Sequence, residues 1–375
     1  MRFRVILLII ITIPLIGFSQ KLPKDSLFGS IKKIREKVIF LTKKENPQII
    51  YESDYGHMGF QGPEKTISIF NSYWYSDHLC YYINYERHFN KDGKIAKDIW
   101  YGKNDVPFNS YRYTYDKKGR INTMIDSSMI ENIAVTKKHY YEQWENSDFL
   151  KKNIIHLDYN FFTMYTIEYV KGKKVKSQQY NDEGIILDTI FKYNDIGKLD
   201  NYISKRRKWS SETNSVRYES RKKIYEYDIK NRLIGIYTSS PFFDNEISKE
   251  QYKNKQFEYD GNNLKTEISF ISDRKKLKEV YINYIYDKSN RLIKRYSFDK
   301  DISKASTILE YTYKKDKIAK LNFSQEEYNE NNNKYLKKYT ILYKYKYDNY
   351  NNWIEIIKTV DGIDLYKWIR EIEYY

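Results

Sequence analysis

Apolar and polar residues alternate along most of this chain. In the stretch YTILYKYKYD, Tyr339, Ile341, Tyr343, Tyr345 and Tyr347 occupy every second position, and mostly polar residues lie between them. Successive side chains of a β-strand point to opposite faces, so this spacing gives one strand an aromatic face and a polar face. The pattern predicts half-buried strands of an antiparallel sheet.

A short phrase ends many of these segments: a tyrosine, then Asp or Asn, two variable residues, and then Gly or Asn. The Asp or Asn side chain can bond the backbone two residues later, and Gly or Asn tolerates the positive φ that closes a type I turn with a bulge. We therefore predict that these are structural turn residues. The clearest pairs are Asp116 with Gly119, Asn194 with Gly197, Asp228 with Asn231, Asp287 with Asn290, and Asp348 with Asn351.

The phrase returns every few tens of residues from about Phe89 to Tyr375. Each interval has room for two strands and two turns, which is typical of a stacked array of similar units. We predict an all-β fold, in which antiparallel β-hairpins form an extended, twisted or curved sheet with open edges. Near the end of the chain, Trp353 and Trp368 are expected to pack on the last hairpins, and Arg370, Glu371 and Glu373 to protect the final edge strand by their charge.

The first 20 residues, MRFRVILLIIITIPLIGFSQ, have the features of a secretory signal peptide. Arg2 and Arg4 form a basic start, an apolar stretch follows, and Gly17 and Ser19 supply the small residues that a signal peptidase recognises. We predict a signal peptide at residues 1–19; an uncleaved N-terminal anchor is the alternative. After cleavage we expect no transmembrane segment, and a protein that is secreted, periplasmic or at the cell surface.

Residues 20–88 lack the clear phrase and are predicted to form an N-terminal cap region ahead of repeats at 89–375. Within the cap region, the glycine-rich segment 51–66 places Tyr55, His57 and Phe60 close together. Two interpretations stay open: a ligand-binding loop, or a cover for the first edge of the array. The segment TISIF at 66–70 has a strand-like pattern. The segment at 30–41 fits a helix or a strand, and the β-rich remainder favours the strand.

No pattern of catalytic or metal-binding residues is present. The five histidines lie apart from one another, and neither a nucleophile motif nor a phosphate-binding or dinucleotide-binding motif occurs. Cys80 is the only cysteine, so it forms no internal disulfide, and we expect a buried, unreactive thiol. We predict no catalytic residue, no metal and no cofactor.

The phrases YDKKGRI, YDIKNRL and YDKSNRL resemble the YD repeat of RHS and teneurin-type proteins, over roughly three quarters of the chain. The chain looks especially like the short exported YD-repeat proteins of Gram-negative bacteria, some of which are described as sugar-binding. Large members of the family wrap their hairpins into a closed cocoon around a toxin. This chain lacks their core segment and has fewer repeats, so we expect an open sheet and not a cocoon.

The chain has 41 Tyr and a formal net charge of +16. Codon usage in an AT-rich genome would also enrich Lys, Asn, Ile and Tyr, so the charge is either functional or a product of composition. We predict an exported, non-catalytic binding or scaffold protein of the envelope. Its partner is expected to be a glycan, an acidic envelope polysaccharide or another envelope protein, and not nucleic acid. The alternative is that the protein is a component of a contact-dependent toxin or immunity system. Candidate binding residues are Tyr55, His57, Phe60, Trp353 and Trp368.

Overall fold

The computed structural model describes residues 27–42, 59–130, 133–143, 150–157, 162–211, 213–238, 253–273, 276–299 and 304–375. The predicted signal peptide at 1–19 lies outside these residues, as do Tyr55 and His57 of the glycine-rich segment.

The described residues form 22 strands of one sheet and one helix. The helix is α1 (Pro63–Trp74). The strands are β1 (Ile31–Phe40), β2 (Asn84–Phe89), β3 (Ile95–Tyr101), β4 (Pro107–Tyr115), β5 (Ile121–Ile130), β6 (Ile133–Gln143), β7 (Leu150–Leu157), β8 (Phe162–Val170), β9 (Lys173–Asn181), β10 (Gly184–Tyr193), β11 (Leu199–Ser210), β12 (Ser215–Tyr227), β13 (Leu233–Thr238), β14 (Lys253–Asp260), β15 (Asn263–Asp273), β16 (Lys276–Tyr286), β17 (Leu292–Asp299), β18 (Ala305–Lys314), β19 (Lys317–Tyr328), β20 (Lys334–Tyr347), β21 (Trp353–Val360) and β22 (Ile363–Tyr374).

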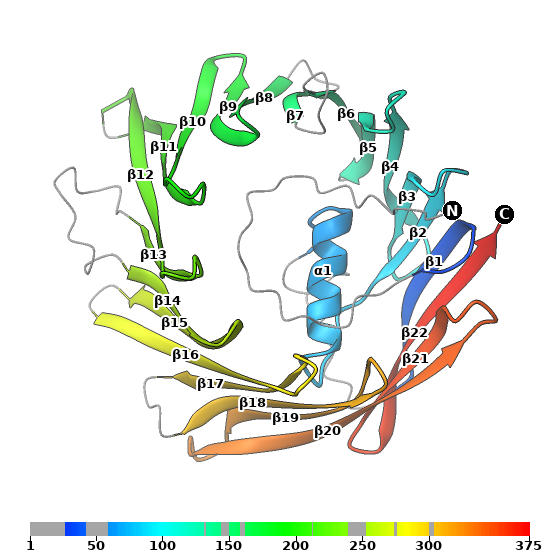
Figure 1. Ribbon diagram of the computed structural model, residues 1–375. Helices are drawn as coiled ribbons and strands as arrows, with labels where there is room; N and C mark the ends of the chain where they lie inside the picture. The colour runs from blue at the N-terminus through cyan, green and yellow to red at the C-terminus, as the bar shows by residue number, and fades with distance from the viewer. Residues whose placement is uncertain are drawn as a thin grey trace.

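The sheet is closed. From β1 to β22 each strand pairs antiparallel with the next, and β22 returns to pair with β1 from Ile31↔Tyr374 to Phe40↔Tyr366. Figure 1 looks into the resulting barrel, with β1 between β2 and β22. The all-β antiparallel prediction is therefore right, but the open sheet is wrong. Turn signals are local and specify only hairpin neighbours, whereas closure depends on β1 pairing with a strand at the other end of the chain.

The inner face of the barrel can be followed from strand to strand. The hydroxyl of Tyr343 donates to the backbone oxygen of Trp74 on α1, and α1 lies inside the barrel (Figure 1). Residues directly opposite each other on antiparallel strands share a face. The register therefore extends this assignment around the ring, for example from Tyr225 to Ile236 and from Phe191 to Tyr202. The tyrosines of the repeats line the inside.

The outer face carries charged residues along the middle of the strands. Lys338, Lys344 and Lys346 of β20 alternate with the inward tyrosines and point outward. Lys294 and Glu310 lie opposite each other on β17 and β18, with 2.8 Å between their charged atoms. Charge on this face keeps it hydrated, because burying unpaired charge is costly.

The repeated phrase builds a turn and a link to the neighbouring hairpin. In Asp116–Gly119, the Asp116 side chain accepts from the backbone nitrogens of Lys118 and Arg120, and Gly119 has a φ of 76°. The Arg120 guanidinium also binds the second Asp116 oxygen. The turns at 194–197, 228–231, 287–290 and 348–351 repeat the backbone bonds and the positive φ. All of them lie at one end of the barrel, which we call the turn rim, because alternate connections of an up-and-down sheet share an end.

A tyrosine near the end of a strand, usually the one that precedes the turn, donates its hydroxyl to the preceding hairpin. In each case the acceptor is a backbone oxygen just after the previous turn. The pairs are Tyr115 with Ile95, Tyr193 with Lys174, Tyr227 with Leu199, Tyr259 with Leu233, Tyr313 with Leu292, and Tyr345 with Ile318. The tyrosine therefore recurs because it buries a ring on the inner face and satisfies a backbone oxygen at the same time.

α1 replaces the strand predicted for residues 66–70. Pro63 occupies the first turn, where its missing N–H costs nothing, and Thr66, Phe70 and Trp74 recur at a spacing of four on the buried face. No helix among the described residues has both the length and the apolar character needed to cross a bilayer.

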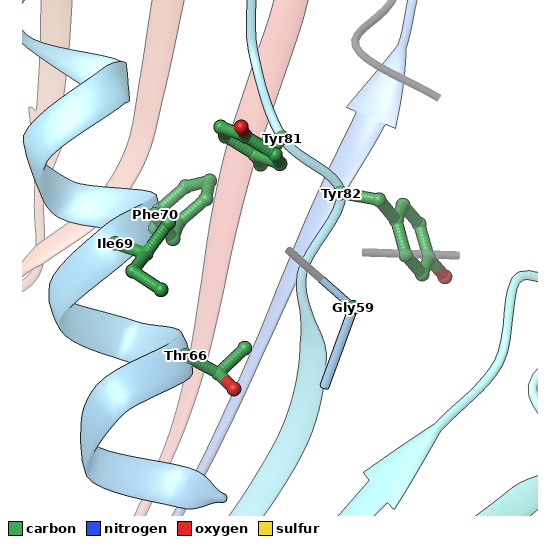
Figure 2. Close-up of a pocket in the computed structure, with 6 residues that line it drawn as sticks. All are labelled: Gly59, Thr66, Ile69, Phe70, Tyr81 and Tyr82. Atoms are coloured by element: carbon green, nitrogen blue, oxygen red, sulfur yellow. The ribbon is translucent and has the colours of Figure 1, made fainter. Parts of the chain in front are cut away.

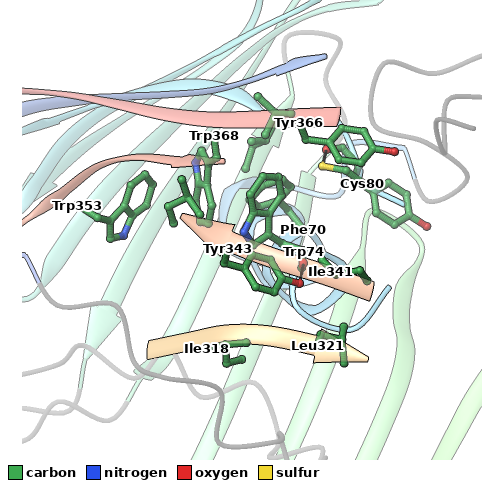
Figure 3. Packing of buried hydrophobic residues seen from close by; sticks show 14 of the residues in the cluster. Phe70, Trp74, Cys80, Ile318, Leu321, Ile341, Tyr343, Trp353, Tyr366 and Trp368 are labelled. Atoms are coloured by element: carbon green, nitrogen blue, oxygen red, sulfur yellow. Dashed lines mark hydrogen bonds between the residues drawn. The ribbon is translucent and has the colours of Figure 1, made fainter. Parts of the chain in front are cut away.

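We call the pairing of β1 with β22 the seam. The main core forms where α1 meets the strands near this seam (Figure 3). Trp368 lies 4.7 Å from Phe70, 5.4 Å from Trp74 and 4.4 Å from Trp353, measured between ring centroids. Trp353 and Trp368 thus pack on the last hairpins. The predicted edge at β22 is wrong, because β1 covers it and Arg370 points into the core against Glu36.

Candidate binding face inside the closed sheet

The described candidate residues from the sequence are in the core. Phe60 packs on Trp100 and Phe108, with ring centroids 4.9 and 5.3 Å apart. Trp353 and Trp368 are each 4% exposed, and the guanidinium of Arg370 lies 3.5 Å from the Trp353 ring centroid. Their ring faces are therefore occupied by other side chains of the chain.

A small pocket lies between α1 and the segment that leads into β2 (Figure 2). Its lining residues are Gly59, Thr66, Ile69, Phe70, Tyr81 and Tyr82. None of these side chains is charged, and the Thr66 hydroxyl oxygen already accepts from the backbone nitrogen of Gln61. The pocket offers few free polar groups for recognition.

A buried polar cluster lies at the C-terminal end of α1. Lys358 is fully buried, and its Nζ donates to the backbone oxygens of Trp74 at 3.0 Å and Leu79 at 2.7 Å. Cys80 beside it is also fully buried, and burial raises the pKa of its thiol to about 12. Cys80 is therefore buried, as predicted, and Lys358 satisfies the backbone oxygen of Trp74 at the helix end and that of Leu79 just after it. This cluster is structural.

A different set of residues forms a charged surface on the inner face of β11 and β12. Arg206 and Lys208 of β11 lie opposite Glu219 and Arg217 of β12, on the same face as Tyr202 and Lys223. This face is the inside, because Tyr202 lies opposite Phe191 on the tyrosine-lined side. We call Arg206, Lys208, Arg217, Arg221 and Lys223 the basic inner ladder.

The ladder has an excess of positive charge. Glu219 is its one acid, with ion-pair distances of 2.7 Å to Lys208 and 3.5 Å to Arg217. Hydrogen bonding to Lys208 lowers the pKa of Glu219, and Arg217 and Arg221 act in the same direction. Arg206, Arg217 and Arg221 are exposed. Five basic side chains around one carboxylate leave charge available for an anion.

Aromatic rings continue the ladder toward the turn rim. Tyr202 lies 5.7 Å from Phe191 and 6.4 Å from Tyr225, between ring centroids. The Nζ of Lys174 is 4.8 Å from the Phe191 centroid, and burial lowers the pKa of Lys174. A polymer lying along β11 and β12 would meet cations first and then flat apolar rings.

The sequence contained a signal for this ladder that the repeat pattern concealed. The runs KRRKW at 205–209 and RYESRKK at 217–223 flank a single turn. If they form a hairpin, alternate basic residues of both runs share one face. Whether that face is inside or outside the barrel depends on closure. Among the described residues, no group of three or more His, Cys, Asp or Glu side chains is placed to hold a metal ion.

Comparison with known proteins gives no family assignment. No family model matches the sequence, and no curated protein matches it. Among solved structures, TcdB2-TccC3-TEV is similar over 76% of this chain and 19% of that chain, with 12% identity and a TM-score of 0.27. A porin-like protein from Bacteroides uniformis is similar over 92% of this chain and 99% of that chain, with 9% identity and a TM-score of 0.24. Such scores do not establish a shared fold, and the resemblance to YD-repeat proteins stays a prediction.

Proposed function

We propose that the protein is an exported, non-catalytic binding protein of the Gram-negative cell envelope, and that it holds an acidic polysaccharide on the basic inner ladder. The observation that carries this proposal is the ladder itself. It places exposed arginines on the inner face of β11 and β12, next to the aromatic rings of Phe191 and Tyr202. Cations attract the acid groups, and ring faces suit the apolar faces of sugars.

The outer face supports an aqueous location for this function. Strands in contact with lipid carry apolar residues outward, and a lysine at mid-membrane depth costs about 2 to 4 kcal/mol. Here Lys338, Lys344 and Lys346 point outward from β20, with Thr340 and Leu342 between them on the same face. Together with the predicted signal peptide, this favours the periplasm or the cell exterior.

The test uses polygalacturonate as the acidic probe and dextran as a neutral probe, with calorimetric titration at two salt concentrations. In the double variant Arg206→Gln and Arg221→Gln, we expect polygalacturonate affinity to fall about tenfold or more. The matched control is Lys205→Gln with Lys222→Gln, since these lysines alternate with the ladder residues on the same strands and point outward. The control should bind as the unchanged protein does, and binding should weaken at high salt.

Three results would contradict the proposal. Equal losses in the two double variants would mean that overall charge, and not the ladder, is responsible. Equal affinity for single-stranded DNA would remove the assignment to polysaccharide. A single stoichiometric partner recovered from envelope extract, without polysaccharide binding, would favour the toxin or immunity component.

A further inference from the structure

A row of polar side chains crosses the inner face on β4 to β7, away from the basic inner ladder. Asn109, Asp126, His139 and Asn153 lie on successive strands. The register displaces each by two residues from the one before. Tyr111 lies opposite Asp126, Met124 lies opposite His139, and Tyr141 lies opposite Asn153. We call these four residues the polar row.

The polar row contains buried atoms that lack hydrogen-bond partners in the described part of the chain. They are Oδ1 of Asn109, Oδ1 of Asp126, both ring nitrogens of His139 and Oδ1 of Asn153. Asn109 is only 8% exposed. Its side chain bonds the Tyr111 hydroxyl and also the Asp126 carboxylate, while its Oδ1 remains unbonded. Buried polar groups are normally satisfied. Five such atoms on four neighbouring residues of one face therefore indicate a missing partner.

The chemistry of the row selects the class of partner. Three of the unbonded atoms are oxygen acceptors. Burial lowers the pKa of His139 to about 4, so at neutral pH its ring is uncharged and has one donor and one acceptor. Burial raises the pKa of Asp126, and the charge of Lys137, which lies opposite it, acts in the other direction. A surface with little net charge and many acceptors suits hydroxyl donors better than it suits a cation or an anion.

Aromatic rings accompany the row along its length. Tyr141 is stacked nearly parallel to His139, with centroids 6.3 Å apart and an interplanar angle of 13°. Tyr111 lies beside Asp126, and Tyr165 lies opposite Asn153. Diagonal neighbours in a sheet are about 7 to 8 Å apart, so the four residues span roughly 20 Å. That length suits a chain of several sugar rings and exceeds the reach of one water molecule.

We infer that the polar row binds an uncharged, hydroxylated segment of a glycan, several sugar rings long. The inference rests on the proposed function, because both place a glycan inside the closed sheet, but it concerns different residues and a different sugar chemistry. Sugar hydroxyls would donate to Asn109, Asp126 and Asn153, while the tyrosines pack on ring faces.

The probes are neutral hexasaccharides built of glucose, galactose, mannose or N-acetylglucosamine, measured by calorimetric titration. The variants are Asn153→Leu and His139→Phe, which remove the unbonded atoms and nearly keep side-chain size. We expect at least one hexasaccharide to bind the unchanged protein and to bind each variant about tenfold more weakly. Lys152→Ala and Lys138→Ala are controls, since both point outward from the same strands and should bind normally.

The outcomes separate this inference from the proposed function. Loss of hexasaccharide binding in Asn153→Leu with unchanged polygalacturonate binding supports both. Failure of all four hexasaccharides to bind, or unchanged binding by both variants, would overturn the polar row as a glycan site and leave the ladder untouched. Because replacing an unsatisfied buried polar group by an apolar one need not destabilise the fold, the variants should melt no earlier than the unchanged protein. Earlier melting in both would show that the row is satisfied structurally, and would also overturn the inference.

Discussion

Glu36 on β1 and Arg370 on β22 form a buried ion pair across the seam of the barrel, 2.8 Å apart and each less than 5% exposed. The second carboxylate oxygen of Glu36 accepts from the indole nitrogen of Trp368 at 2.9 Å. On the outer side of the same strands, Arg35 lies opposite Glu371 and Lys33 opposite Glu373. Opposite charges therefore face each other on both sides of the seam, and a shift of one residue would place them wrongly.

Replacing Glu36 by Ala should strongly destabilise the closed sheet. The change leaves the Arg370 guanidinium buried without its partner, which costs about 3 to 5 kcal/mol. Urea unfolding followed by tyrosine fluorescence would measure it. Adding Arg370→Met to Glu36→Met should recover part of the loss, and Lys367→Ala, on the outer face, should change little. An unchanged unfolding midpoint in Glu36→Ala would contradict closure through this pair.

Removing residues 367–375 should open the barrel. β22 pairs with β21 on one side and with β1 on the other, so the deletion exposes two strand edges and part of the core. We expect aggregation, visible by light scattering, together with a lower melting temperature. A monodisperse product with unchanged melting would mean that the sheet does not need its seam.

Gly197→Val should lower the free energy of unfolding by about 1 to 3 kcal/mol. Gly197 has a φ of 82°, and an added Cβ would lie 2.5 Å from the Nζ of Lys173. The matched control is Asn231→Gly, because Asn231 already has a φ of 61°, which glycine adopts freely. Thermal unfolding of both variants checks the turn assignment; equal melting of the two would refute it.

Tyr259→Phe should remove about 1 kcal/mol of stability. Its hydroxyl donates to the backbone oxygen of Leu233 at 2.8 Å, and the variant keeps the ring while it leaves that oxygen unsatisfied. Tyr347→Phe is a suitable control because Tyr347 is 42% exposed. Chemical unfolding should give a lower midpoint for Tyr259→Phe than for Tyr347→Phe. Equal midpoints would mean that the hydrogen bond between hairpins does not contribute to stability.

Lys358 should make the protein progressively more stable than its Lys358→Met variant as the pH rises from about 8 to about 9.5. Burial lowers its pKa from 10.5 to about 8. Between these values Lys358 holds more protons in the unfolded chain than in the folded chain, so raising the pH favours folding through this residue, by about 1 to 2 kcal/mol over this window. The difference in free energy of unfolding between the unchanged protein and Lys358→Met should therefore grow with pH, whereas the difference for Lys344→Met should stay constant. Tyrosines of the unfolded chain ionise in the same range and lower the stability of all three proteins alike, so the comparison cancels their effect. A difference for Lys358→Met that does not change with pH would contradict the lowered pKa.

The sequence by itself determined most of the strands, the turns and the residues that share a face. Alternation places Tyr343 and Tyr345 on one side of a strand, and the spacing of Asp116 and Gly119 places a turn, since both depend on interactions within a few residues. The basic runs at 205–209 and 217–223 also contain the signal of a one-sided cluster, but whether that side faces inward depends on closure.

Only the tertiary structure decided closure and everything that follows from it. Glu36 and Arg370 are separated by 334 residues, and no local pattern specifies such a contact. Pairing of β1 with β22 gives the sheet an inner face, buries Trp353 and Trp368, and encloses α1. In α1, contacts between buried residues four positions apart prevail over the strand-like alternation of residues 66–70. The polar row likewise depends on the register of four strands, because each strand contributes one residue to it.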